Sequence, residues 1–218
     1  MSITRELLYE EFFRNNQLVS FLKRNRLSLN IVDSRNFMQY KDYLGNINIC
    51  NPDFIKETYE LLSYAMLQDE GNIGIFLTKH ENSSFDIVVS LIINTEPDVD
   101  MKEMLSRDTV KETLIEVILL CSNWKKRVYY AAKQILQVLQ AVFELHNKNM
   151  ILKVAKGIDN ENALMFYKEL GFYPIKNMKS TLLWTPSHYT QYGGRIMMVH
   201  KGLRGGKYIQ LKNRRVYV

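Results

Sequence analysis

The run from Asn160 to Phe172 contains the side chain with the clearest chemical potential, the phenol of Tyr167. Asn160 can cap a short helix and Gly171 can end it, and the apolar residues between them recur at three- and four-residue spacing. Extended apolar runs precede and follow this helix. A strand, a short helix and a second strand form a compact unit that can place Tyr167 beside a bound ligand. The same pattern also fits an aromatic face that only packs in the core.

A carboxylate stands inside an almost continuous apolar run, L-I-E-V-I-L-L-C over residues 114–121. Such a run is typical of a strand that is covered on both faces. Glu116 therefore has two interpretations. It is either a desolvated carboxylate that can take part in proton transfer, or a residue near the exposed beginning of the strand that faces solvent.

This strand leads into a basic loop and then into a helix. The loop contains Lys125, Lys126 and Arg127, and the following residues to Leu145 carry a regular apolar stripe. Where a loop opens a helix, unpaired backbone N–H groups and the helix dipole can hold a pyrophosphate. Positive charge beside such a site favours acidic phosphates. The alternative is a solvated loop.

The segment 160–172 reads N-x-x-A-x-x-F-Y-x-x-L-G-F and resembles the second CoA-binding motif of the GNAT superfamily of acyl-CoA-dependent N-acetyltransferases. The resemblance implies that Tyr167 lies near the CoA sulfur and protonates the departing thiolate. It also implies that the region of Asn160, Ala163 and Phe166 contacts the cofactor. In this family a glutamate on the strand that corresponds to 114–121 sometimes acts through water as the general base, which would be Glu116.

The family's pyrophosphate loop has the form Q/R-x-x-G-x-G/A, and residues 127–132 read R-V-Y-Y-A-A. The basic first residue and the small last residue are kept, but Tyr130 stands where the first glycine belongs. Its ring either points away and leaves the amides free, or it occupies the cofactor's volume. The resemblance implies acetyl-CoA as co-substrate, without a metal. At the end of the strand 114–121 and in the loop after it, the implied cofactor-binding residues are Cys121, Ser122, Arg127, Val128, Tyr130 and Ala132.

The fold class that the resemblance implies is α/β (α+β), with a mixed, mostly antiparallel twisted sheet, flanking helices and splayed central parallel strands. We expect a helical extension over 1–28, a GNAT-like domain over 29–200 and a basic tail over 201–218. Two functions remain open. The chain is an N-acetyltransferase that acts on an amine of a small molecule or a protein, or it is a GNAT-fold binding or structural protein that has lost acyl transfer and attaches through its tail.

Other elements follow from local patterns. Residues 3–27 predict one or two helices with a break near Asn15 and Asn16. The further expected elements are a first strand at either 29–32 or 46–50, a helix from Asn51 to about Gln68, an antiparallel hairpin of 73–78 with 85–94, and a linking insertion over 95–113.

The C-terminal tail carries the excess positive charge. Residues 201–218 contain six Lys and Arg residues and no Asp or Glu, whereas the whole chain has a net charge of +6. Tyr208 to Leu211 and Arg214 to Val218 read as a β-hairpin that could bind a polyanion or nucleic acid, with Tyr208 or Tyr217 stacking on bases. The alternative is a solvated ribbon docked on its own domain or on another subunit. The tail also weakly resembles basic modules of proteins from large DNA viruses.

Composition argues against a membrane protein, a disulfide-rich protein and a metalloprotein. The chain has 218 residues, 46% of them hydrophobic, and no apolar run approaches the roughly 20 residues of a membrane helix. We expect a soluble intracellular protein, cytoplasmic or, if viral, in a virion, with no membrane partner. The two cysteines, Cys50 and Cys121, and the scattered histidines support neither a disulfide framework nor a metal site. The strand at 195–200 could pair across a subunit boundary, but the sequence leaves the oligomeric state open.

Overall fold

A computed structural model describes residues 2–40, 66–81, 84–97, 113–123, 128–154, 160–175, 178–186, 189–192, 195–201, 207–211 and 214–217. The chain forms two compact units. The first comprises residues 1–97 and 115–142, and the second comprises residues 98–114 and 143–218.

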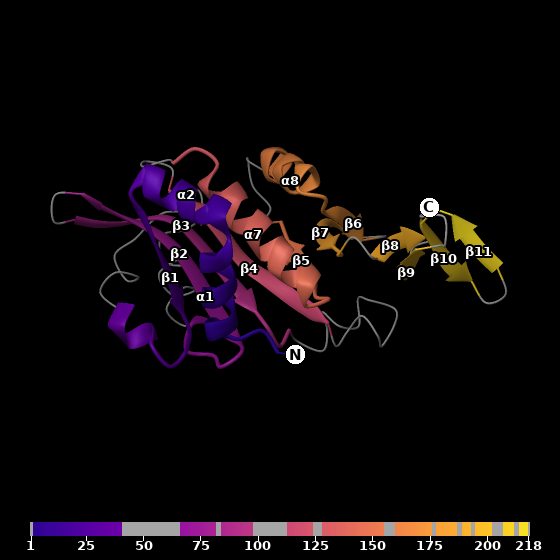
Figure 1. The fold of residues 1–218 in the computed structure, drawn as a ribbon, viewed down its shortest axis with the longest axis horizontal. Coiled ribbons are helices and arrows are strands. Elements are labelled where there is room, and N and C mark those ends of the chain that lie inside the picture. The colour runs from indigo at the N-terminus through magenta and orange to yellow at the C-terminus, as the bar shows by residue number, and fades with distance from the viewer. Residues whose placement is uncertain are drawn as a thin grey trace. The chain divides into compact units, whose positions relative to one another are not determined.

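Two short helices begin the first unit, as the sequence predicts. Helix α1 spans Arg5–Arg14 and α2 spans Asn16–Asn25. Asn15 separates them and caps α2, because its side chain accepts a hydrogen bond from the backbone N–H of Leu18 at 2.9 Å. The two helices contact each other and the first strand (Figure 1).

The first strand, β1, spans Leu27–Val32, which confirms the first of the two expected positions. A short 3-10 helix, η1, follows at Phe37–Tyr40. The other expected strand position at 46–50, residues 51–65 of the predicted helix and residues 98–112 of the predicted insertion lie outside the described residues.

A run of four antiparallel strands in the order β1-β2-β3-β4 organises the first unit (Figure 1). The expected hairpin is confirmed as β2 (Asn72–Glu81) with β3 (Ser84–Asn94). The expected apolar strand is β4 (Leu114–Ser122), and the expected helix is α7 (Ala131–Leu145). The last three residues of α7 belong to the second unit, as does the first residue of β4.

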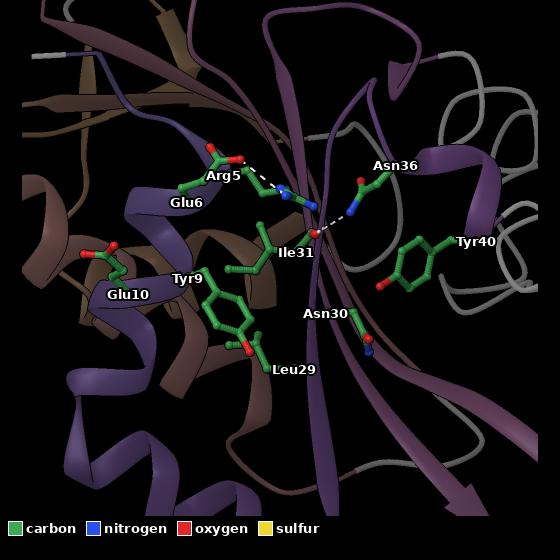
Figure 2. A pocket seen from close by; sticks show the side chains of 9 residues that line it. All are labelled: Arg5, Glu6, Tyr9, Glu10, Leu29, Asn30, Ile31, Asn36 and Tyr40. Atoms are coloured by element: carbon green, nitrogen blue, oxygen red, sulfur yellow. Dashed lines mark hydrogen bonds and ion pairs between the residues drawn. The ribbon is translucent and has the colours of Figure 1, made fainter.

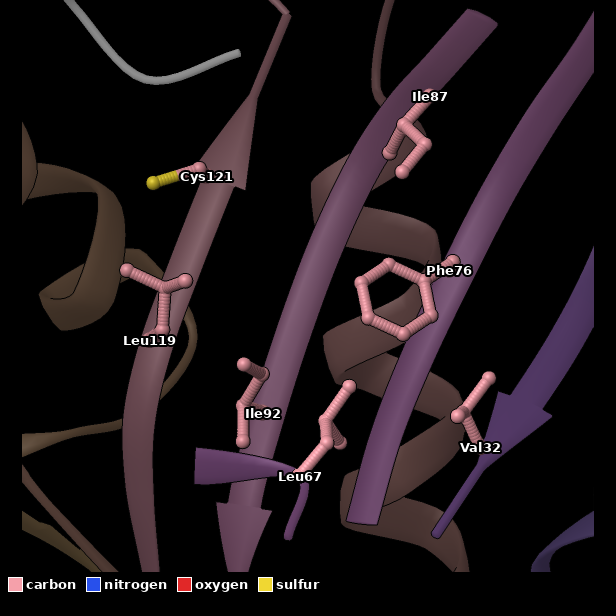
Figure 3. Close-up of a cluster of buried hydrophobic side chains, with 7 residues drawn as sticks. All are labelled: Val32, Leu67, Phe76, Ile87, Ile92, Leu119 and Cys121. Atoms are coloured by element: carbon pink, nitrogen blue, oxygen red, sulfur yellow. The ribbon is translucent and has the colours of Figure 1, made fainter. Parts of the chain in front are cut away.

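A buried apolar cluster lies on one face of these strands. Figure 3 shows its side chains projecting from β1 to β4 and from Leu67. Phe76 lies directly over Gly74, since a Cβ added to Gly74 would come within 2.6 Å of the Phe76 ring. A glycine is therefore required there for close packing. The cluster consists of Val32, Leu67, Phe76, Ile87, Ile92, Leu119 and Cys121.

The second unit has its own strands and core. Strand β5 (Asn149–Lys153) pairs with β7 (Met178–Trp184), and β7 pairs with β6 (Tyr173–Ile175), all antiparallel. Helix α8 spans Asn160–Glu169, between β5 and β6 in the chain. A small apolar cluster of Leu114, Ile151 and Leu183 holds this part together.

A four-stranded antiparallel sheet ends the chain, in the order β11-β10-β9-β8. Its strands are β8 (Tyr189–Tyr192), β9 (Arg195–Lys201), β10 (Lys207–Leu211) and β11 (Arg214–Tyr217). The pair β10–β11 is the predicted C-terminal hairpin, and β10 also pairs with β9. The three domain boundaries stay predictions.

The expected mixed α/β architecture with a mostly antiparallel sheet and flanking helices is confirmed. The predicted splay would involve one strand from each unit and stays a prediction. Among the described residues, no helix has the length and apolar character needed to cross a membrane.

Candidate functional site

Tyr167 lies among aromatic side chains near the end of α8. Its ring meets Phe166 edge to face with centroids 5.2 Å apart, and it meets Phe172 in the same way at 5.5 Å. Edge-to-face pairs of this kind add about 0.5–1.5 kcal/mol beyond the buried area. These contacts hold the half-buried phenol ring in one orientation.

The backbone carbonyl of Tyr167 ends the helix. It accepts hydrogen bonds from the backbone N–H groups of Leu170 at 3.1 Å and Phe172 at 3.0 Å. Gly171 has a φ of +82°, a left-handed conformation that favours glycine. The expected closure of the helix at Gly171 is therefore observed, and it turns the chain directly into β6.

Burial raises the pKa of Tyr167 to about 12. Removing the phenol from water disfavours its charged form, so the hydroxyl keeps its proton at neutral pH. Among the residues that the structure describes, none shares a hydrogen bond with this hydroxyl. The phenol is thus a protonated hydrogen-bond donor at neutral pH.

The other residues assigned to this side of the site share α8. Asn160 is its first residue, while Ala163 and Phe166 follow at three-residue spacing and are half-buried. Residues three apart on a helix lie on the same side. Asn160, Ala163 and Phe166 therefore follow one another along one side of α8.

Glu116 lies on β4, in the first unit, and a β-bulge determines which way it faces. Glu116 pairs with Asn94 and Leu119 pairs with Ile92, which leaves Ile118 as the extra residue. Residues two apart on β3 face the same side, and directly paired residues share a face. Glu116 therefore faces the same side of the sheet as Leu119 and the cluster of Figure 3. Without the bulge, a separation of three residues would place the two on opposite faces.

The end of β4 is tied to β3. The backbone N–H of Asn123 donates to the carbonyl of Val88 at 2.8 Å, and its side-chain amide donates to the carbonyl of Ile87 at 2.9 Å. The side chain of Ser122 is exposed. Cys121 is disulfide-bonded, which corrects the expectation of no disulfide and removes its thiol from any cofactor site. The chain's other cysteine, Cys50, lies outside the described residues.

The start of α7 contains the residue that departs from the GNAT pattern. Tyr130 has a φ of +62°, the left-handed conformation that glycine adopts most readily. Its carbonyl accepts the first helical hydrogen bond, from the N–H of Gln134 at 2.9 Å. Its side chain is 61% exposed and lies edge-on to Tyr129, with centroids 4.4 Å apart. The backbone thus keeps the glycine conformation while the ring lies at the surface of the unit.

The rest of the predicted loop is only partly described. Val128 is half-buried and its carbonyl accepts a hydrogen bond from the N–H of Ala131 at 3.1 Å. Ala132 is the second residue of α7, and its N–H forms no hydrogen bond to any residue in the described ranges. Arg127 and the two lysines before it lie outside those ranges.

Sequence reasoning missed a cavity of about 500 Å³ in the first unit. Figure 2 shows its lining side chains from α1, β1 and the segment after β1. Arg5 lies near buried Asp33, with Nε 3.7 Å from a carboxylate oxygen, and Glu6 accepts from Arg35 at 2.8 Å. No local motif marks these residues, because the ion pairs join positions about thirty residues apart in the chain. The lining residues are Arg5, Glu6, Tyr9, Glu10, Leu29, Asn30, Ile31, Asn36 and Tyr40.

Within the first unit the structure thus places Glu116, Cys121 and Ser122 on β4, and Val128, Tyr130 and Ala132 at the start of α7. Within the second unit it places Asn160, Ala163, Phe166 and Tyr167 on α8. In the described part of the chain, no group of three or more His, Cys, Asp or Glu side chains is arranged to hold a metal ion.

Comparison with known proteins connects this architecture to acetyltransferases. No protein-family model matches the chain, and no curated protein matches its sequence. The crystal structure of AtaTR bound with AcCoA is similar, with a TM-score of 0.50 and 10% identity, over 73% of this chain and 93% of that chain. Its likeness shows that the chain has the fold of the GNAT acetyltransferases.

Two further solved structures have lower scores. An aminoglycoside acetyltransferase, HMB0005, from an uncultured soil metagenomic sample has a TM-score of 0.46 and 16% identity, over 66% of this chain and 90% of that chain. A ribosomal-protein-alanine N-acetyltransferase from Brucella melitensis biovar Abortus 2308 has a TM-score of 0.42 and 14% identity, with the same coverages. None of these comparisons supports the viral likeness of the tail.

Proposed function

We propose that this chain is an acyl-CoA-dependent N-acetyltransferase that transfers the acetyl group of acetyl-CoA to an amine of a small molecule or a protein. The observation that carries the proposal is the environment of Tyr167. Its ring is oriented by two aromatic contacts, its carbonyl ends the helix, and its hydroxyl is a protonated donor. The GNAT fold supports this assignment.

In the proposed reaction the amine nitrogen attacks the thioester carbonyl carbon, so a C–N bond forms and the C–S bond breaks. The electron pair of that bond leaves on sulfur, and the Tyr167 hydroxyl donates its proton to the thiolate. Glu116, through water, takes the proton that the amine nitrogen must lose. Solvent then returns a proton to the tyrosinate, and the products are an amide and free CoA thiol.

The raised pKa of Tyr167 limits how its proton moves. With pKa values of about 12 for Tyr167 and about 8.5 for a free thiol, complete transfer is uphill by about 5 kcal/mol. Burial also raises the pKa of a thiol, and this reduces the difference in a water-poor site. Tyr167 therefore acts first as a hydrogen-bond donor to sulfur and transfers its proton late, as the C–S bond breaks.

The start of α7 supplies the proposed pyrophosphate site. Orphan N–H groups in the first turn of a helix bind anions, and the Ala132 N–H is such a group among the described residues. The left-handed backbone at Tyr130 matches the glycine position of the family loop. We assign Val128, Ala132 and the charge of Arg127 to the phosphates, together with the backbone at Cys121 and Ser122. We assign Asn160, Ala163 and Phe166 to the pantetheine arm.

Calorimetric titration with acetyl-CoA tests the proposal. We expect saturable binding with a dissociation constant between about 1 μM and 1 mM, the usual range for enzyme substrates. CoA without the acetyl group is the control ligand, because it retains every phosphate of acetyl-CoA. The alternative, a GNAT-fold binding protein without acyl transfer, predicts no heat with either ligand at millimolar concentration, and that result would rule out the enzyme.

A further inference from the structure

Three aromatic rings form a row across the C-terminal sheet. His200 on β9 pairs directly with Tyr208 on β10, and Tyr208 pairs directly with Tyr217 on β11. Directly paired residues of antiparallel strands share a face of the sheet. The rings of His200 and Tyr208 are stacked with centroids 5.4 Å apart, and those of Tyr208 and Tyr217 are tilted at 5.9 Å. The row therefore spans three strands of one face.

This face is the accessible side of β10 and β11. Ile209 follows Tyr208 on β10 and is fully buried, so its side of the sheet is covered. Because successive residues of a strand point to opposite faces, Tyr208 lies on the other side. Tyr217 in the same row is 68% exposed. Ile209 thus lies on the covered face of the sheet, and the row of rings lies on the accessible face.

A cationic side chain lies against the row. The guanidinium carbon of Arg215 lies 4.9 Å from the centroid of the Tyr208 ring, within cation–π range. Arg215 is exposed on the face of the row, whereas the exposed side chains of Lys207 and Arg214 alternate to the other face of the sheet. The segment 201–218 has six basic residues and no acidic residue. A large anion that also presents flat apolar faces would match both the charge and the rings.

We propose that this face binds a single-stranded polynucleotide. Unpaired bases stack on the Tyr217 ring, while the phosphates contact the guanidinium of Arg215, which lies over the Tyr208 ring. A duplex keeps its bases stacked on each other, so it cannot offer them to the exposed Tyr217 ring. The proposal goes beyond acyl transfer and does not depend on it, since it uses only residues of the C-terminal sheet.

Fluorescence anisotropy with the full chain and labelled oligonucleotides of about ten residues tests the proposal. The probes are oligouridylate, oligothymidylate, an abasic strand with the same number of phosphates, and a duplex. We expect both base-bearing single strands to bind at least about tenfold more tightly than the abasic strand. Tighter binding of the ribose or the deoxyribose strand would identify the sugar that the site prefers, and either preference supports the proposal.

Two variants distinguish the contribution of base stacking to binding from that of positive charge. Tyr217→Leu should weaken binding of the base-bearing strands by about 5- to 150-fold and leave the abasic strand unchanged. Arg215→Gln should weaken binding of all four probes and reduce the salt slope. The matched control is Tyr9→Leu, which removes a 52% exposed tyrosine from α1 and should change nothing. Tyr217 is itself exposed, so circular dichroism should show that its variant remains folded.

Two results would overturn the proposal. Equal affinity for the abasic strand, the duplex or polyglutamate would reduce the face to a general polyanion surface. Absence of binding to any single strand at low salt would remove the site altogether.

Discussion

The ring of Tyr167 lies edge to face against the ring of Phe172 at 5.5 Å, and the backbone N–H of Phe172 donates to the carbonyl of Tyr167 at 3.0 Å. The same two residues are thus joined through side chain and backbone. Gly171, with its positive φ, lies between them and makes the close return possible. The end of α8 and the start of β6 therefore fix the phenol together, so its orientation does not depend on a ligand.

We expect Tyr167→Phe to lower turnover by at least about tenfold with little change in acetyl-CoA affinity, because it removes the donor and keeps the ring. Turnover is measured by thiol release and affinity by calorimetry. Tyr173→Phe is a matched control. It removes another half-buried hydroxyl, which donates to the Thr185 hydroxyl at 3.4 Å, and it should leave turnover intact. Equal turnover in the Tyr167 variant would remove the general-acid role.

The raised pKa of Tyr167 also predicts a pH dependence of stability. The unfolded phenol loses its proton near pH 10, whereas the folded phenol holds it to about pH 12. Above pH 10 the unfolded chain releases this proton first, so the contribution is complete below pH 10 and is lost between pH 10 and 12. Its upper limit is about 2.7 kcal/mol.

Urea unfolding of the native chain and of Tyr167→Phe across this pH window measures the effect. The free energy of unfolding of the native chain should fall more steeply than that of the variant. Tyr9→Phe, at an exposed position, should follow the native chain. Parallel curves for the native chain and the Tyr167 variant would contradict the buried-phenol interpretation.

Local signals in the sequence predicted the elements well. Gly171 and Asn15 end and begin helices where the sequence places them, because left-handed turns and side-chain caps are properties of one or two residues. The bulge at Ile118 had no such signal. It arises from the hydrogen-bond register of two strands distant in the chain, and only that register shows that Glu116 shares a face with Leu119.

The sequence alone allows two positions for the Tyr130 ring, away from the cofactor or in its volume. Its aromatic side chain argues against a left-handed backbone, yet the turn into α7 imposes one. The turn that opens the helix therefore overrides the preference of the residue itself. The cavity lined by Arg5 and Glu6 has no local signal either, since it lies between α1 and residues of β1 and the following segment that are distant in the chain.

The left-handed backbone of Tyr130 predicts that its replacement by glycine and its replacement by alanine differ in stability. A left-handed conformation costs a non-glycine residue about 1–2 kcal/mol, and glycine avoids this cost. Tyr130→Gly should therefore leave the chain at least as stable as Tyr130→Ala. Because glycine also lets phosphates approach the backbone, it should tighten acetyl-CoA binding. Thermal unfolding and calorimetry measure the two effects.

The alanine variant is the control for loss of the ring, since it removes the same exposed side chain without freeing the backbone. If both variants bind acetyl-CoA equally and more tightly than the native chain, the ring alone hinders the cofactor. Weaker binding in both variants would instead mean that the Tyr130 ring contacts the cofactor.

The role of Glu116 predicts a rate loss that depends on pH. A general base matters most where the acceptor amine is protonated, well below its pKa of about 10.4, and matters little where the amine is already neutral. Glu116→Gln keeps the size of the side chain and removes the base. We expect kcat/KM to fall by about a hundredfold near neutral pH, and the loss should shrink as the pH approaches the pKa of the amine.

Glu96→Gln is the control. It lies at an exposed position of the same unit and should show no loss of kcat/KM at any pH. A loss of equal size across the whole pH range would show that Glu116 only supports the structure of β4.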